Sequence, residues 1–256
     1  MTKIAVISDI HGNADSLRLV LKQLKEKQVD LTVCLGDLLT YGTSPIEVID
    51  LLLNYAEKNR LIMIKGNHDQ FYFDILSGDF KHYSMPEFVL ESIYWSAEKI
   101  ASIKYESLFD WKESYSYQNI YFAHANPFKY GDWRYVEKQE LVEEAFLTLL
   151  DKNFYCGIFG HSHRQLMLKR DDKLTDFSLD VSNLSFNNQQ AVIINSGSIG
   201  QPRGRGYCYC LLDLKKEDIN AKFISFQPDV EKLIRDLHST DMSYDTKLKL
   251  CDYLRS

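Results

Sequence analysis

Short apolar runs alternate with amphipathic stretches over the first part of the chain. Residues 4–8, 31–36 and 61–65 are rich in Ile, Val and Leu and are bounded by polar residues or glycine, a pattern typical of buried strands. Between them, residues 14–27 and 45–58 carry apolar side chains at helical spacing, and Pro45 suits the first turn of a helix. The pattern predicts a β-α-β-α-β unit and a parallel sheet.

Strands predominate in the second half. One helix is predicted at 137–152, and a polar stretch at 169–190 is predicted to be an exposed hairpin or loop. The predicted strands are 119–125, 154–160, 165–169, 191–195, 207–214 and 221–226. Because helices become scarce while strands accumulate, we expect a second sheet packed on the first, followed by a helical tail at about 228–256.

Residues 71–115 differ in composition from the rest of the chain, since they are helical in pattern and rich in aromatic residues. We interpret this segment as a helical cap inserted into an α/β domain. Its rings suit stacking on a nucleobase, but aromatic clusters within helices more often form core. The aromatic residues are Phe71, Tyr72, Phe73, Phe80, Tyr83, Phe88, Tyr94, Trp95, Tyr105, Phe109 and Trp111.

Composition narrows the class of protein. The 256 residues are 45% hydrophobic and 26% charged, which predicts one domain over 1–256. The net charge is −6 and no Lys or Arg run stands out, so neither nucleic acid nor an anionic membrane is an expected partner. No signal-peptide pattern and no apolar stretch long enough to cross a bilayer occurs, which favours a cytoplasmic location.

The five cysteines are scattered and odd in number, unlike a disulfide framework. Cys208 and Cys210 would lie on the same side of a strand. We expect two small buried side chains there rather than a metal or redox pair.

Polar residues suited to metal binding follow five of the predicted strands. Five of the seven histidines lie at these strand ends. In open α/β sheets, ligands bind beyond the carboxyl ends of the strands. The residues are Asp9, His11, Asp37, Asn67, His68, Asp69, His124, His161 and His163.

Each of these fragments is weak alone, since an isolated Asp-x-His is usually a turn and an isolated His-x-His is as often a surface pair. Together they are more specific. Residues two apart in extended backbone point to one side, so Asp9 with His11, and His161 with His163, can approach a common centre. The set predicts a metal site.

The ordered blocks DIHG (9–12), GD (36–37), GNHD (66–69), His124 and GHSH (160–163) resemble the calcineurin-like metallophosphoesterases, particularly compact bacterial and archaeal members. LGDLLTYGTSPIEVID (35–50) and NSGSIGQPRG (195–204) are similar to two further blocks of that subgroup. Ala125 and Ser196 depart from its usual glycine and proline. The resemblance implies a four-layer α-β-β-α sandwich of two mixed sheets.

The resemblance also implies a two-metal centre. Asp37 would bridge the two ions, because a carboxylate has enough lone pairs to reach both. Mixed nitrogen and oxygen ligands suit Mn²⁺, Fe, Zn²⁺, Co²⁺ or Ni²⁺ better than Ca²⁺, and Mn²⁺ is our first expectation. The implied ligands are Asp9, His11 and His163 for the first ion and Asn67, His124 and His161 for the second.

The chemistry implied is hydrolysis of a phosphate mono- or diester by in-line attack of a hydroxide that bridges the metals. His68 would protonate the leaving oxygen, with Asp69 accepting its other ring N–H. Neither a G-x-S-x-G elbow nor a P-loop occurs. Arg203 and Arg205 either contact the phosphate or lie in a solvated loop.

The substrate stays open at this stage among phosphodiesters, nucleotides, phosphoproteins and dinucleoside polyphosphates. The alternative is a non-catalytic scaffold, because the family resembles a retromer subunit that uses the same fold to bind proteins. Such a module would need neither an acid nor a complete ligand set. Since both are present here, an enzyme is favoured.

Overall fold

The first part of the chain alternates between strands and the helices that cover them. Strands β1 (Thr2–Ile7), β2 (Leu31–Cys34) and β3 (Leu61–Ile64) are separated by helices α1 (Ala14–Glu26) and α2 (Pro45–Ala56). The β-α-β-α-β order expected from the sequence is confirmed. The structure is a computed structural model that describes residues 1–78, 85–170, 183–187, 190–216 and 218–255.

Two mixed sheets form the centre of the molecule. One has seven strands in the order β4-β3-β2-β1-β11-β12-β9, and the other has five in the order β5-β6-β7-β10-β8. β1 to β4 run parallel, as do β6, β7 and β10, so their carboxyl ends share an edge. The remaining strands are β4 (Trp111–Lys112), β5 (Ser114–Tyr117), β6 (Ile120–Ala123), β7 (Cys156–Phe159), β8 (Gln165–Lys169), β9 (Asn183–Asn187), β10 (Val192–Ser196), β11 (Cys208–Lys215) and β12 (Asp218–Ser225).

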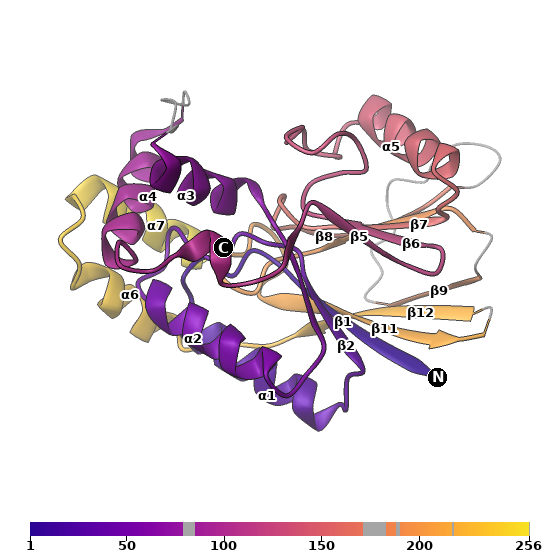
Figure 1. The fold of residues 1–256 in the computed structure, drawn as a ribbon, viewed down its shortest axis with the longest axis horizontal. Helices are drawn as coiled ribbons and strands as arrows, with labels where there is room; N and C mark the ends of the chain where they lie inside the picture. Colours follow the sequence, from indigo (N-terminus) through magenta and orange to yellow (C-terminus); the bar gives the residue numbers. More distant parts are fainter. Residues whose placement is uncertain (79–84, 171–182, 188–189, 217, 256) are drawn as a thin grey trace.

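Alternation along the strands generates four layers. Val6 and Ile158 pack in the core between the sheets. The residues that follow them, Ile7 and Phe159, face outward against helices. Helices α1 and α2 cover the first sheet and α5 (Gln139–Asp151) covers the second (Figure 1). The predicted α-β-β-α sandwich is confirmed.

The segment 71–115 is only partly the helical cap that the sequence predicted. Helix α3 (Asn67–Ser77) begins earlier, and α4 (Glu87–Lys99) is followed by a short 3-10 helix, Tyr105–Ser107. β4 then pairs with β3, and β5 pairs with β6. The end of the predicted cap therefore belongs to the two sheets, where aromatic residues suit a half-buried extended strand.

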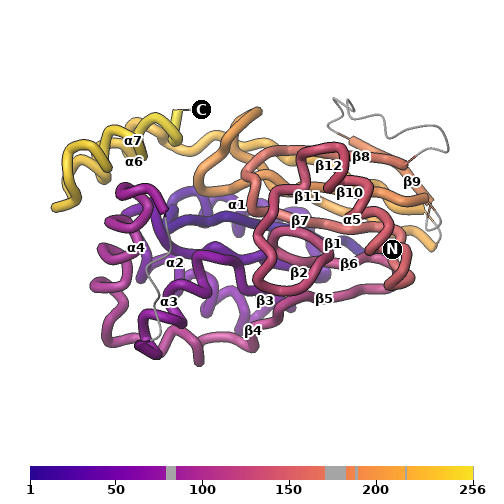
Figure 2. The backbone as a smooth tube through the Cα atoms, turned by 90° about the horizontal axis from the view of Figure 1, so that it is seen from above, coloured from indigo at the N-terminus to yellow at the C-terminus, as the bar shows by residue number. Residues whose placement is uncertain are grey.

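The last two helices are α6 (Val230–His238) and α7 (Tyr244–Leu254); α7 folds back against α4, and α6 packs beside α7 (Figure 2). The Glu91 carboxylate of α4 accepts hydrogen bonds from the hydroxyls of Ser243 and Thr246 at the start of α7. The indole N–H of Trp95 donates to Asp241, 2.6 Å away. These contacts bring the end of the chain beside the helices that follow β3.

The stretch 169–190, predicted to be an exposed hairpin or loop, contains the strand β9. β9 pairs with β12 at the edge of the larger sheet, and Leu184 and Phe186 face the core between the sheets. The strand was not recognised in the sequence because only these two alternating positions are apolar and the residues around them are polar. Residues 171–182 and 188–189 lie outside the described residues.

The five cysteines are all buried and unpaired, so the expectation of small buried side chains at Cys208 and Cys210 is confirmed. Among the residues that the structure describes, no helix combines the length and the apolar content that crossing a membrane requires.

Candidate dinuclear metal centre

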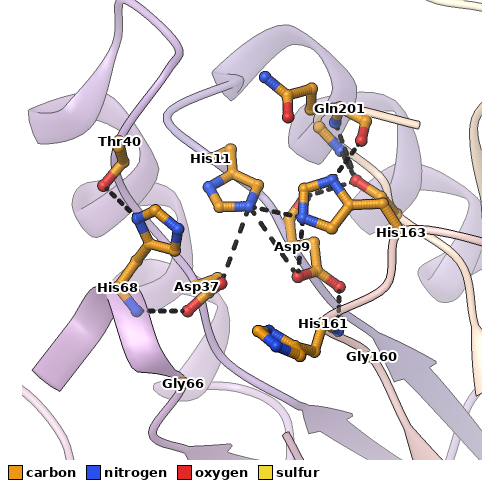
Figure 3. Close-up of polar contacts among 12 residues, drawn as sticks. Asp9, His11, Asp37, Thr40, Gly66, His68, Gly160, His161, His163 and Gln201 are labelled. Atoms are coloured by element: carbon orange, nitrogen blue, oxygen red, sulfur yellow. Dashed lines mark hydrogen bonds and ion pairs between the residues drawn. The ribbon is translucent and has the colours of Figure 1, made fainter. Parts of the chain in front are cut away.

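The seven side chains expected to bind metal gather at one edge of the two sheets. β1 is followed by Asp9 and His11, β2 by Asp37, β3 by Asn67, β6 by His124, and β7 by His161 and His163. Because these strands are parallel within each sheet, their loops leave each sheet at one end, and the contacts of Asp9 with His163 and of Asp37 with His124 bring the two ends together. Figure 3 shows side chains from the loops after β1, β2 and β7 pointing toward one another.

The first group consists of Asp9, His11 and His163, all buried. The two Nε2 atoms are 3.1 Å apart, and Asp9 Oδ1 lies 3.3 Å from Nε2 of His163. Nδ1 of His11 lies 3.0 Å from the carbonyl oxygen of Leu39, and Nδ1 of His163 lies 2.6 Å from that of Gln201. A carbonyl only accepts hydrogen bonds, so each Nδ1 carries the proton and both facing Nε2 atoms are bare.

The second group repeats this arrangement. Nδ1 of His124 donates to the carbonyl oxygen of Leu35 at 2.8 Å, and Nε2 of His161 donates to that of Trp133 at 2.9 Å. In the neutral rings Nε2 of His124 and Nδ1 of His161 are therefore both without a proton, although they are 3.2 Å apart. The Asn67 side-chain oxygen lies 3.0 Å from the same Nε2 of His124.

Asp37 lies between the groups. Its Oδ2 is 3.3 Å from Nε2 of His124 and 3.8 Å from Nε2 of His11, and its Oδ1 accepts the main-chain N–H of His68 at 2.9 Å. The approach is close enough that a Cβ at Gly66 would overlap the carboxylate. One oxygen of Asp37 is therefore directed toward both groups.

These contacts fit metal ions better than they fit hydrogen bonds. Two bare imidazole nitrogens repel each other at hydrogen-bond distance unless a cation or a proton lies between them. In addition, Asp9 Oδ1 is buried and has no hydrogen-bond partner among the described residues, which is costly for a carboxylate oxygen. Main-chain acceptors behind the metal-facing imidazoles are also what protein metal sites commonly use to orient histidine ligands.

The backbone is strained at most of these positions. φ is positive at five non-glycine residues of the set, with 54° at Asp9, 48° at His11, 55° at Asp37, 64° at His161 and 58° at His163. Such a conformation costs a non-glycine residue about 1–2 kcal/mol. Because the strained residues are the ones whose side chains meet at this site, we infer that the strained backbone serves to place these side chains and not merely to turn the chain.

The carboxylates and imidazoles shift one another's pKa values. Burial would raise the pKa of Asp37, but the nearby His124 and His68 lower it well below its usual value. Burial would lower the pKa of His124, but Asp37 raises it to about 9. Burial and the neighbouring His124 lower the pKa of His161 to about 3. In the metal-free chain one proton is therefore held on His124 at neutral pH.

The predicted hydrogen bond between Asp69 and the ring of His68 is wrong. His68 Nδ1 lies 3.1 Å from the hydroxyl of Thr40, and Nε2 lies 3.4 Å from that of Tyr41. Thr40 is itself 2.7 Å from the hydroxyl of Tyr72. Because α3 begins at Asn67, His68 and Asp69 are consecutive helical residues and point in different directions.

Asp69 instead links the loops that follow β2 and β3. Its carboxylate accepts the main-chain N–H groups of Gly66 at 2.8 Å, Asp37 at 2.7 Å and Leu38 at 3.1 Å, and the hydroxyl of Tyr105 at 2.7 Å. As the third residue of α3 it reaches back over the start of the helix, as capping residues do. Asp69 therefore positions Asp37 and does not contact His68's ring nitrogens.

The two arginines differ in their surroundings. Arg203 is partly buried, and its main-chain N–H donates to the carbonyl oxygen of His163 at 3.2 Å. Arg205 is exposed. Of the two, Arg203 is the one that borders the first group.

Sequence reasoning missed several residues that shape the site. Thr40 and Tyr72 lie behind His68, and the loop between β6 and α5 supplies the Trp133 carbonyl and the ring of Tyr135, which stacks on His161. A main-chain acceptor leaves no side-chain signal in a sequence. The only signal for Thr40 was its place in the block LLTYG.

Comparisons with known proteins agree with this geometry. The model of the calcineurin-like phosphoesterase family matches residues 2–165. An uncharacterized protein of Methanocaldococcus jannaschii is 28% identical over 236 residues, 90% of this chain and 89% of that protein. A metallophosphoesterase from Sphaerobacter thermophilus superposes with a TM-score of 0.73 over 97% of this chain and 98% of its own, at 20% identity, a likeness that concerns the fold alone.

A shorter match, 34% identical over 74 residues, links the chain to a symmetrical bis(5′-nucleosyl)-tetraphosphatase of Sodalis glossinidius. It covers 28% of this chain and 26% of that protein.

Metal affinity should rise with pH. A metal at the second group must displace the proton of His124, whose pKa in the metal-free chain is about 9. Below that pH each unit of acidification should weaken Mn²⁺ binding by about tenfold, and the dependence should level off above it. Calorimetric titration of the metal-free protein from about pH 7 to 9.5, in buffers of different ionisation enthalpy, measures both the affinity and the proton released. Binding that is independent of pH and releases no proton would contradict the assignment of the His124 nitrogen.

Asp69→Asn should loosen the site without touching a metal-facing atom. The amide keeps one acceptor oxygen and directs an N–H₂ group at main-chain N–H donors, so we expect a loss of about 2–4 kcal/mol in the free energy of unfolding and weaker metal binding through displacement of Asp37. Urea denaturation and metal titration provide the measurements. Asp74→Asn, five residues further along α3, is the matched control and should change neither quantity by much. Wild-type stability in Asp69→Asn would remove the linking role.

Proposed function

The chain belongs to the calcineurin-like phosphoesterase family, and on that premise we propose that it hydrolyses phosphate esters with two divalent metal ions. Asp37 would contribute to both ions, since its Oδ2 lies between the two groups. The other proposed ligands are Asp9, His11 and His163 for the first ion and Asn67, His124 and His161 for the second.

One observation carries this proposal. Four imidazoles donate their outer N–H to main-chain carbonyls and direct their other ring nitrogens at one another across 3.1 Å and 3.2 Å. Imidazole, carboxylate and amide ligands together favour a transition metal over Ca²⁺. We propose Mn²⁺ first, with Fe, Zn²⁺, Co²⁺ and Ni²⁺ as competitors.

Two such ions, when bound, lower the pKa of a water molecule and neutralise charge on the phosphate oxygens. The chain's own contribution is to orient the phosphate between them. Arg203 is positioned for this, since its main chain is bonded to His163 and its side chain is partly buried. Arg205 would add charge at the exposed rim.

His68 is the proposed donor to the leaving oxygen. Its ring lies 5.1 Å from that of His11, centroid to centroid, yet it takes no part in either ligand group. Burial lowers the pKa of His68 to about 4 in the metal-free chain. At neutral pH the ring is therefore a neutral hydrogen-bond donor unless the negative charge of a bound phosphate restores its second proton. Dependence of the rate on the leaving group separates these two modes.

Monoesters and diesters both remain within the proposal. A nucleotide is a candidate, because the relative from Sodalis glossinidius is named as a dinucleoside tetraphosphatase. The five buried, unpaired cysteines fit a reducing compartment, which supports a cytoplasmic location.

His68→Ala should separate metal binding from turnover. Metal content should stay at wild-type level, while kcat falls by roughly 10²–10⁴ for an alkyl phosphate, whose leaving group is basic. The fall should be smaller for p-nitrophenyl phosphate and bis-p-nitrophenyl phosphate, because p-nitrophenolate leaves with little protonation. Metal analysis and steady-state kinetics on the same preparations give both quantities.

Asp37→Asn is the contrasting variant and should lose metal and turnover together, because an amide lacks the charge to serve both ions. Equal losses for alkyl and p-nitrophenyl substrates in His68→Ala would leave His68 a purely electrostatic role. A fully metal-loaded wild-type protein that hydrolyses none of these esters would favour the non-catalytic scaffold.

A further inference from the structure

Two large rings of the cap segment are not available to a substrate. Tyr72 and Tyr105 are fully buried. Their rings pack on each other, and the ring of Tyr105 also packs on Phe73 and Trp111, at centroid distances of 5.4–5.9 Å. These rings form core, as aromatic residues in helices usually do. A ring that recognises a substrate must instead have an exposed face.

Tyr135 meets that requirement. It lies in the loop between β6 and α5, and its ring is stacked on His161 with a centroid distance of 4.4 Å and an interplanar angle of 10°. His161 is buried, whereas Tyr135 is 44% exposed. An aromatic ring therefore covers a proposed metal ligand while much of its own surface faces solvent.

Arg203 has contacts with both this ring and the first group, since its side chain interacts with Tyr135 and its main-chain N–H donates to the carbonyl oxygen of His163. Its guanidinium is 5.3 Å from the ring centre of Tyr253 on α7, and its Nε is buried without a hydrogen-bond partner among the described residues. Burial would lower the pKa of Arg203, but Tyr41, Tyr135 and Asp9 raise it, so all three lie near the guanidinium. The buried, unpaired N–H is a donor suited to a phosphate oxygen.

We propose that Tyr135 stacks on a planar ring of the substrate while Arg203 contacts its phosphate, so that the site selects nucleotides over phosphate esters of plain sugars. The inference rests on the proposed function for the position of the phosphate. Stacking of a base on an aromatic side chain tolerates any base, because every base has a π face. Selection by Tyr135 should therefore depend on the presence of a base more than on its identity.

Two ligands with the same phosphonate group, one with a base and one without, test the proposal. The probes are the phosphonate isosteres of AMP and of ribose 5-phosphate, in which CH₂ replaces the ester oxygen and prevents hydrolysis. With Mn²⁺-loaded protein, calorimetry should give a Kd about tenfold lower for the AMP isostere. Tyr135→Leu should abolish this ratio and leave the Kd of the ribose isostere within about twofold. Tyr135→Phe, which keeps the ring, should preserve the ratio.

Tyr94→Leu on α4 is the matched control, since Tyr94 is 45% exposed, and its ratio should equal that of wild type. Equal affinity for the two isosteres in wild-type protein overturns the stacking role whatever the variants do, as does a ratio that survives in Tyr135→Leu. If neither isostere nor inorganic phosphate binds the metal-loaded protein, the proposed phosphate site itself is wrong.

Discussion

Two buried carboxylates and the inward ring nitrogens of four imidazoles are held within a few ångströms of one another, and this crowding of lone pairs governs the structure around it. Asp9 and Asp37 contribute negative charge, while His11 faces His163 and His124 faces His161 through their inward nitrogens. Hydrogen bonds alone do not satisfy all of these atoms, because every outer N–H is already committed to a carbonyl and the extra proton on His124 serves only its own neighbours. Bound cations would supply the missing attraction, and the rest of the fold keeps the side chains from relaxing apart.

The fold does this by combining rigid strands with strained loop residues. Parallel strands in both sheets end at the same edge, so a residue or two beyond each strand reaches the centre. Left-handed backbone at Asp9, Asp37 and His161 turns these side chains inward at a local cost. Asp69 offsets part of that cost by bonding three main-chain N–H groups of two neighbouring loops. The site is therefore stabilised by residues that are not themselves proposed to contact a metal or a substrate.

Much of this could be predicted from the sequence. Apolar periodicity predicted the β-α-β-α-β start and the change to a second sheet, because buried strands and amphipathic helices leave strong patterns. Residue types at strand ends predicted which side chains converge. The direction in which individual side chains point was harder to predict. The role of Asp69 was misassigned because the start of α3 at Asn67 was not foreseen. Consecutive residues of a helix point in different directions, so Asp69 cannot reach the ring of His68. Other parts of the site depend on tertiary contacts, which cannot be predicted from one sequence. These are the contacts of Thr40, Tyr135 and the Trp133 carbonyl.

The central claim is that one edge of the sandwich holds two metal ions that share Asp37. Anomalous X-ray scattering from a crystal of the Mn²⁺-loaded protein tests it most directly. The account predicts two peaks about 3.5–4 Å apart, one beside Asp9, His11 and His163 and the other beside Asn67, His124 and His161, with Asp37 in contact with both. A single peak, or two peaks without Asp37 between them, would contradict it.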